Sequence, residues 1–256
     1  MTILRIAAFL FAALFATAAQ AEIKTEWVEY SHDGVKLKGY LAYDDAITGK
    51  RPGILMVHRR DGMTALTLKN TEMYAKMGYV AFAPDIFGYG HGVLPKDVPE
   101  MMAQMSIYTK DRALMRSRTQ AGLDVLLKNP RVDASHVALV GYCMGGMIGV
   151  EMIFAGVPMD AMVSIHGSFK DHPVGGGKNI KGTRVLIEHG AEDKPAPLPE
   201  VDKVLAALRA ANIEFEYDLY SGAGHGFSEP HSKPDERANT LSIQATQRFL
   251  KETFGI

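Results

Sequence analysis

The sequence Val137-Ala-Leu-Val-Gly-Tyr-Cys-Met-Gly-Gly146 joins a predicted strand to a predicted helix through a sharp turn. Its first four residues form an apolar run typical of a buried strand, and residues 148–155 have helical composition. Between them, residues 141–145 fit the pattern Gly-x-nucleophile-x-Gly, which in this context presents the central side chain above a sheet. Cys143 would then lie at a helix N-terminus, where backbone N–H groups favour a thiolate and a developing oxyanion. The pattern therefore predicts that Cys143 is a nucleophile.

Predicted strands alternate with predicted helices along most of the chain. The predicted strands are 26–30, 35–43, 54–57, 79–83, 137–140, 161–165, 184–188 and 214–219. The predicted helices are 66–77, 98–128 as one long or broken helix, 148–155, 198–211 and 237–253, and residues 171–182 are expected to form an exposed loop. This alternation predicts an α/β fold with a mostly parallel sheet of about eight strands and helices on both faces.

The N-terminus has the organisation of a secretory signal peptide. A short basic start ends at Arg5, residues 6–18 are apolar, and Ala19-Gln-Ala21 fits a cleavage site. We therefore expect residues 1–21 to be removed and residues 22–256 to form a single domain, periplasmic or secreted in a bacterium, without stable membrane insertion. The alternative is an uncleaved membrane anchor, for which the apolar run is short.

Charge and cysteine content restrict the classes of function. The chain has 28 Lys and Arg against 29 Asp and Glu, and loss of Arg5 leaves 27 basic residues and a net charge of −2. This balance argues against a nucleic-acid partner. Cys143 is the single cysteine, so it has no disulfide partner within the chain, and the alternative to a nucleophile is a buried structural thiol. No dinucleotide fingerprint and no convincing metal-ligand spacing is present, so we expect no cofactor and no metal.

Two further residues complete a predicted catalytic set. Cys143, Asp193 and His225 each follow the end of a predicted strand, and the carboxyl ends of parallel strands meet at one edge of a sheet. His225 would take the thiol proton and return it to the leaving group, while Asp193 would orient the imidazole. The alternatives are a helix cap or surface carboxylate for Asp193 and an ordinary loop histidine for His225.

Three stretches resemble the dienelactone hydrolase family, which places a cysteine nucleophile on an α/β-hydrolase fold. Residues 141–146 resemble its nucleophile turn, residues 189–197 its acid loop and residues 220–227 its histidine loop, in the same order. The resemblance covers nearly all of the chain after residue 25. It implies an α/β-hydrolase fold and hydrolysis of a small carboxylic ester or lactone through a Cys143 acyl-enzyme, in a monomer or weak dimer. A thioesterase, a peptidase-like hydrolase and a non-catalytic thiol-sensing or binding protein are the alternatives.

The resemblance also implies which backbone groups form the oxyanion hole, and the sequence differs from the family pattern at two places. The oxyanion hole should use the N–H groups of Met144 and Arg60. Arg59 stands where the family commonly has a Glu that contacts the resting thiol; a guanidinium there would favour the thiolate, unless it pairs with Asp61 instead. Residues 87–90 lack the Arg with which dienelactone-specific enzymes bind the substrate carboxylate. The candidates for lining the pocket are His58, Arg59, Tyr89, Tyr142, His166 and Phe227.

Overall fold

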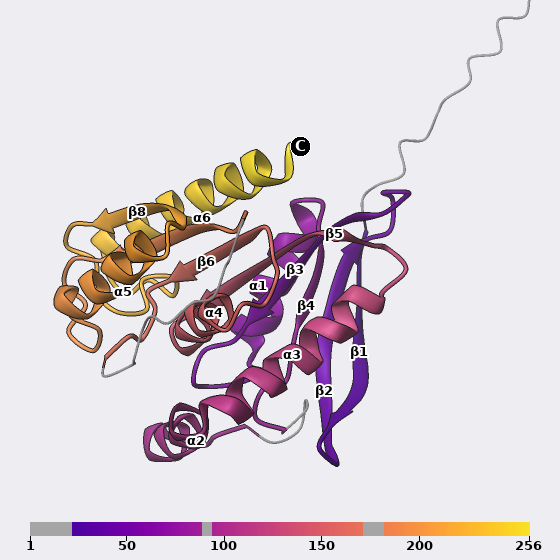
Figure 1. Ribbon diagram of the computed structural model, residues 1–256, viewed down its shortest axis with the longest axis horizontal. Helices are drawn as coiled ribbons and strands as arrows, with labels where there is room; N and C mark the ends of the chain where they lie inside the picture. The colour runs from indigo at the N-terminus through magenta and orange to yellow at the C-terminus, as the bar shows by residue number, and fades with distance from the viewer. Residues whose placement is uncertain (1–21, 89–93, 171–181) are drawn as a thin grey trace, which may run out of the picture.

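The computed structural model describes residues 22–88, 94–170 and 182–256 (Figure 1). Within these ranges eight strands form one sheet. The strands are β1 (Ile23–His32), β2 (Val35–Asp44), β3 (Arg51–Val57), β4 (Val80–Ala83), β5 (Val132–Tyr142), β6 (Ala161–Ile165), β7 (Arg184–Gly190) and β8 (Glu214–Tyr220). The helices are α1 (Ala65–Lys76), α2 (Val98–Lys110), α3 (Arg112–Lys128), α4 (Met144–Phe154), α5 (Leu198–Ala210) and α6 (Lys233–Phe254).

The sheet is mostly parallel, as the sequence predicts. Its strand order is β1-β2-β4-β3-β5-β6-β7-β8, and the six strands from β4 to β8 in this order run parallel to one another. The hairpin of β1 and β2 forms one edge and pairs antiparallel with β4. The parallel arrangement places the carboxyl ends of β3, β5, β6, β7 and β8 at one edge of the sheet, where ligands bind in open α/β sheets.

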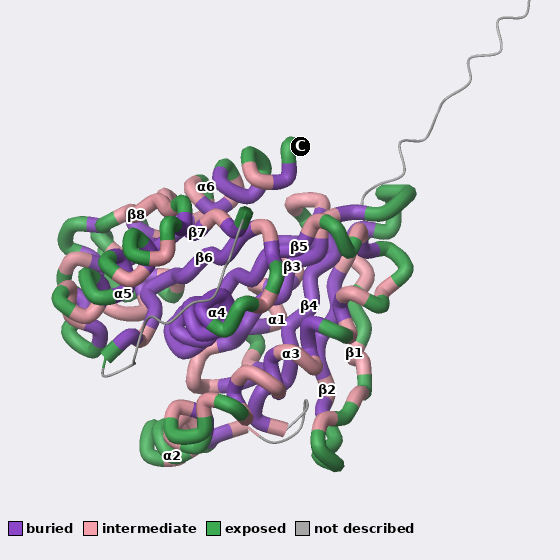
Figure 2. The backbone as a smooth tube through the Cα atoms, in the orientation of Figure 1, coloured by how far each residue is buried: buried purple, intermediate pink, exposed green. Residues whose placement is uncertain are grey.

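Two hydrophobic cores cover the two faces of the sheet. Successive residues of a strand point to opposite faces. Accordingly, Leu55 and Val57 of β3 pack in the core that includes α3, α4 and α5, and Ile54 and Met56 pack in the core that includes α1 and α6. Helix α4 is buried along its whole length, and the central strands are nearly so (Figure 2). Burial on both faces explains why these strands read as continuous apolar runs.

Several boundaries differ from the predicted ones. The predicted helix 98–128 is broken at Asp111, whose side chain accepts a hydrogen bond from the Leu114 N–H and so begins a new helix. Strand β5 begins at Val132, five residues before the apolar run, because it pairs there with Arg51 across an irregularity in register. Helix α6 begins at Lys233 after the N-cap Ser232, with a proline in its first turn.

Other predictions lie outside the described residues: the signal peptide 1–21, Tyr89 and nearly all of the predicted loop 171–182. Among the helices that are described, none is both long and apolar enough to span a membrane.

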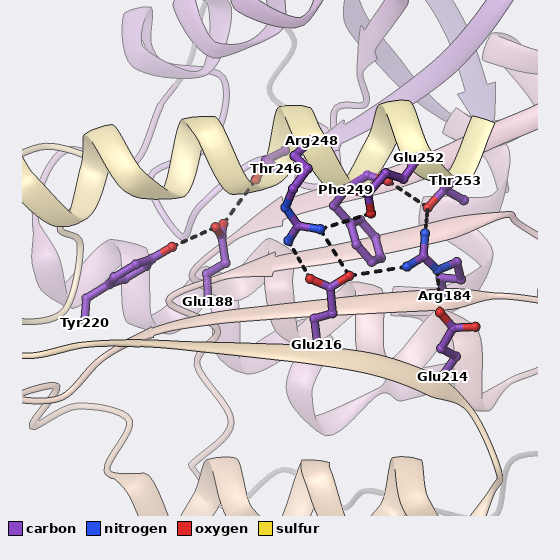
Figure 3. Close-up of polar contacts among 10 residues, drawn as sticks. All are labelled: Arg184, Glu188, Glu214, Glu216, Tyr220, Thr246, Arg248, Phe249, Glu252 and Thr253. Atoms are coloured by element: carbon purple, nitrogen blue, oxygen red, sulfur yellow. Dashed lines mark hydrogen bonds and ion pairs between the residues drawn. The ribbon is translucent and has the colours of Figure 1, made fainter. Parts of the chain in front are cut away.

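Polar contacts fasten the outer strands to α6 (Figure 3). Glu216 of β8 pairs with Arg248 of α6 at 2.5 Å and with Arg184 of β7 at 3.3 Å. Further along β7, toward its carboxyl end, the buried carboxyl group of Glu188 accepts hydrogen bonds from Tyr220 of β8 and from Ser242 and Thr246 of α6. These contacts hold the half of the sheet that carries the acid and histidine loops.

Candidate active site

Cys143 occupies the sharp turn between β5 and α4. Its backbone adopts φ 53° and ψ −112°, a conformation that residues other than glycine rarely adopt. The turn requires close backbone contacts: a Cβ at Gly141 would lie 2.1 Å from the Gly145 carbonyl oxygen, and a Cβ at Gly145 would lie 2.2 Å from the Val57 carbonyl oxygen. The predicted turn is therefore present, and it is pressed against the end of β3.

The structure brings Cys143, His225 and Asp193 together in a hydrogen-bonded chain. His225 Nε2 lies 3.2 Å from Cys143 Sγ, and its Nδ1 lies 2.7 Å from Asp193 Oδ2. The three residues follow β5, β8 and β7, so the edge that the sequence predicts does gather them. With Nδ1–H donating to Asp193, Nε2 faces the sulfur and can take or return its proton.

Asp193 is fixed by its own loop. Its side chain is buried, and its second oxygen accepts a hydrogen bond from the Ala196 N–H at 2.8 Å. The Ala196 carbonyl accepts in turn from the buried His189 at 2.7 Å. Asp193 is therefore neither a surface carboxylate nor a helix cap, and its orientation toward His225 is set before any substrate binds.

The electrostatics of the pair favour a thiolate and an imidazolium. Burial opposes ionisation of Cys143, but the hydrogen bond and positive charge of His225, the Ser168 hydroxyl and the Met144 N–H together lower the pKa of the thiol below its usual range. Burial also disfavours the charged form of His225, yet its bonds to Asp193 and Cys143 raise the pKa of the imidazole to about 9. Both shifts favour the thiolate–imidazolium pair over the neutral thiol and imidazole, and the thiolate is the more nucleophilic form of a cysteine.

A cavity of about 330 Å³ opens beside the sulfur. Cys143, His166 and His225 lie on its wall, together with Arg59 and Arg60 from the loop after β3. Helix α2 supplies an apolar wall through Val98 and Met101, and the histidine loop supplies Gly226, Glu229 and His231. In the described part of the chain, no group of three or more His, Cys, Asp or Glu side chains is arranged to hold a metal ion.

Arg59 pairs with carboxylates rather than with the thiol. Its guanidinium forms ion pairs with Asp61 at 2.5 Å and with Glu229 at 2.8 Å. The sequence left two possibilities for Arg59: that it favours the Cys143 thiolate, or that it pairs with Asp61. The structure shows the pair with Asp61. The second ion pair also joins the loop after β3 to the histidine loop across the cavity.

The other predicted pocket residues separate into two groups. His166 lies on the cavity wall with φ 41°, its Nε2 is 2.7 Å from Ser228 Oγ, and burial together with the charges of His225 and Arg59 holds its pKa well below the usual value. His58, Tyr142 and Phe227 lie in the core instead. Tyr142 turns away from the cavity because it is a β5 residue on the α1 side of the sheet, where its hydroxyl bonds Tyr74 at 2.8 Å.

Sequence reasoning missed Ser168 and several other residues that reach the site from loops and from α2. Ser168 Oγ lies 3.1 Å from Cys143 Sγ, and its N–H bonds the Cys143 carbonyl. Ser168 follows β6, so the strand-end rule that selected His166 also reaches this loop. No comparable sequence pattern points to the other cavity residues, which are Asp61, Val98, Met101, Glu229 and His231.

The two predicted oxyanion donors belong to different elements. Met144 is the first residue of α4, and its N–H acts on the Cys143 sulfur. Arg60 lies in the loop after β3, and its N–H has no acceptor among the residues that the structure describes. Unpaired N–H groups at the wall of a cavity can stabilise an oxyanion.

This sheet, with a cysteine at a strand–helix turn and then an aspartate and a histidine after later strands, has the architecture of the α/β-hydrolases. Within that class, the chain belongs to the dienelactone hydrolase family, whose sequence model matches residues 37–254.

Named relatives agree with this family. A Synechocystis protein named "putative carboxymethylenebutenolidase" is 28% identical over 220 residues, which cover 80% of this chain and 87% of the relative. Among solved structures, a dienelactone hydrolase-like promiscuous phosphotriesterase from metagenomic libraries is 25% identical, with a TM-score of 0.82 over 91% of this chain and 99% of that one. The same fold occurs in an acylaminoacyl peptidase from Pyrococcus horikoshii, which is 16% identical with a TM-score of 0.70. The match covers 91% of this chain and 42% of the peptidase chain.

Proposed function

We propose that this hydrolase of the dienelactone hydrolase family cleaves carboxylic esters or lactones through an acyl group carried on Cys143. The observation that carries the proposal is the continuous hydrogen-bonded chain from Cys143 through His225 to Asp193 at the wall of the cavity. The family and its named relatives support ester or lactone bonds as the bonds cleaved.

The proposed reaction has two halves. The Cys143 thiolate attacks the acyl carbon, and the N–H groups of Met144 and Arg60 bind the oxyanion of the tetrahedral intermediate. The C–O bond to the alcohol breaks as the His225 imidazolium gives its proton to the departing oxygen. Neutral His225 then takes a proton from water, which attacks the thioester; the C–S bond breaks, and the carboxylic acid leaves.

The walls of the cavity support a substrate with an apolar part. Val98 and Met101 of α2 line the cavity together with charged loop residues, and methionine side chains adapt to ligands of different shape. We expect the apolar part of the ester to lie against α2, with the reacting carbonyl beside Cys143.

Substitution of the three residues tests the reaction. Cys143→Ala should abolish ester hydrolysis without unfolding the protein, and His225→Ala should be nearly as severe. Asp193→Asn should retain more activity, because the geometry survives while the tautomer of His225 does not. The assay should compare a lactone, an aryl ester, a thioester and a phosphotriester. Near wild-type hydrolysis by Cys143→Ala would contradict the covalent route.

The same purified protein separates this proposal from its alternatives. Preference for the thioester by more than tenfold would favour a thioesterase, and cleavage of an acyl-peptide would favour a peptidase-like hydrolase. Stoichiometric oxidation of Cys143 by peroxide without turnover of any ester would favour a thiol-sensing protein. We also propose that the protein is exported, with residues 1–21 as a cleaved signal peptide.

A further inference from the structure

His58 is buried in the core, and its hydrogen bonds define one neutral tautomer. It directly follows β3 and is 1% exposed. The Ile86 N–H points at His58 Nε2 from 3.3 Å, and an N–H can only donate, so Nε2 is the acceptor. Nδ1 therefore carries the hydrogen and donates it to the Arg59 carbonyl oxygen, 2.6 Å away. Burial lowers the pKa of His58, although the negative charges of Asp85 and Asp61 oppose the shift. The lowered pKa favours the neutral form with its hydrogen on Nδ1.

The Arg59 carbonyl is held from two directions. Besides His58, the Gly62 N–H donates to it at 3.1 Å. Every peptide bond in the described part of the chain is trans, so the Arg60 N–H points opposite to the Arg59 carbonyl. Fixing the carbonyl in the core therefore fixes the direction of the N–H.

This loop lies directly against the nucleophile turn. A Cβ at Gly145 would be 2.2 Å from the Val57 carbonyl oxygen and 3.0 Å from that of His58. The backbone at Val57 and His58 thus packs against Gly145, two residues after Cys143. Arg60 and Cys143 line the same cavity. The Arg60 N–H has no acceptor in the described part of the chain, so it is free to bind a ligand.

We propose that His58 is a positioning residue for the oxyanion hole: its Nδ1–H holds the Arg59 carbonyl in the core and so directs the Arg60 N–H into the cavity beside Cys143. The inference rests on the proposed function, because it needs an acyl oxyanion to stabilise. Loss of an entire oxyanion donor costs about 100- to 1,000-fold in kcat. Loss of its orientation should cost less, roughly 10- to 100-fold.

Two reactions of the same sulfur test this role. Acylation of Cys143 by p-nitrophenyl acetate passes through an oxyanion, whereas alkylation by iodoacetamide displaces iodide at carbon and forms none. We expect His58→Leu to slow acylation about 10- to 100-fold and to change alkylation less than about twofold. His58→Asn places an amide N–H near the Nδ1 position and should recover most of the acylation rate.

Controls separate positioning from damage to the fold. Thr71→Val removes a buried hydroxyl that donates to the Thr67 carbonyl on α1, and it should leave both rates unchanged. If His58→Leu does not fold, His58→Gln replaces it, because its amide reaches toward the Nε2 position and leaves the Arg59 carbonyl without that donor.

Three outcomes would overturn the role of His58. They are wild-type acylation by the variant that lacks the Nδ1 donor, an equal fall of acylation and alkylation, and failure of His58→Asn to exceed His58→Leu. Wild-type protein that is alkylated but never acylated would overturn the proposed function as well.

Discussion

Cys143 combines an unfavourable backbone conformation with dense local bonding. A strained residue of this kind costs on the order of 1–3 kcal/mol and persists only where its surroundings determine it. The Cys143 N–H donates to the Ile165 carbonyl at 3.0 Å, and the Cys143 carbonyl accepts from Ser168 and from the first turn of α4. Neighbouring strand ends therefore hold the sulfur in place, and Gly145 lets them approach.

Gly145→Ala tests this close approach. The added Cβ would lie 2.2 Å from the Val57 carbonyl oxygen, so the backbone must shift. We expect destabilisation by roughly 1–3 kcal/mol or more and loss of ester hydrolysis. Gly224→Ala is the matched control: a Cβ there has no described atom within 4 Å, and the change in the free energy of unfolding should stay within about 0.5 kcal/mol. Equal urea denaturation curves for the two variants would contradict the account.

The pH dependence of Cys143 alkylation tests which groups lower the thiol pKa. A free cysteine has a pKa of about 8.5. Because the pKa of Cys143 is lowered, its thiolate should persist below that pH, and alkylation should stay fast there. The rate should fall only as the pH drops through the lowered pKa. His225→Ala should raise the apparent pKa most and Ser168→Ala less. Because Arg59 pairs with Asp61 and Glu229, Arg59→Gln should leave the curve in place. A larger shift for Arg59→Gln than for Ser168→Ala would restore Arg59 as the controlling charge.

At the scale of elements, hydrophobic runs predict where the buried strands and helices lie but not where they end. The start of β5 depends on pairing with Arg51, which no local pattern records. The start of α6 does have a signal, Ser232 followed by Pro234, and hydrophobic periodicity overlooked it because that first turn is polar. Local chemistry at element ends therefore carries information that periodicity lacks.

Strand β7 contains a buried carboxyl group, and we expect it to make the stability of the protein depend on pH. Burial raises the pKa of Glu188 to about 8, although the hydroxyls of Ser242, Tyr220 and Thr246 oppose the shift. The folded protein then keeps a proton that the unfolded chain loses near pH 4.5. The free energy of unfolding should therefore fall as pH rises through this window, by at most about 1.4 kcal/mol per pH unit for one proton.

Glu188→Gln should remove this share of the pH dependence (Figure 3). Urea unfolding of the variant and of the wild type, across the window from about pH 4.5 to about pH 8, measures the difference. An unchanged slope in the variant would show that the carboxylate is already ionised there in the folded protein.

At the scale of the whole molecule, the parallel sheet explains why the three central residues could be predicted. Cys143, Asp193 and His225 lie far apart in the sequence, yet each follows a strand whose carboxyl end meets the same edge. The cavity wall could not be predicted in the same way. The positions of Val98, Met101 and Glu229 depend on how α2 and the histidine loop pack over that edge, and tertiary packing leaves no local pattern in the sequence.

Export of the protein is testable by intact mass. Cleavage after Ala21 should leave Glu22 as the first residue of protein recovered from the periplasm or medium of a bacterial host. An Ala21→Arg variant should be cleaved poorly, because small residues are required at that site. Protein that retains residues 1–21 and fractionates with membranes would contradict cleavage.

The most direct test of the central claim is to trap the acyl group. Rapid mixing with p-nitrophenyl acetate should release a burst of p-nitrophenol equal to the number of active sites, and acid quenching within the burst should leave one acetyl group on the peptide that contains Cys143. His225→Ala should show neither at a comparable rate. Sustained hydrolysis with no acetyl group on Cys143, or with the acetyl group on another residue, would contradict the account.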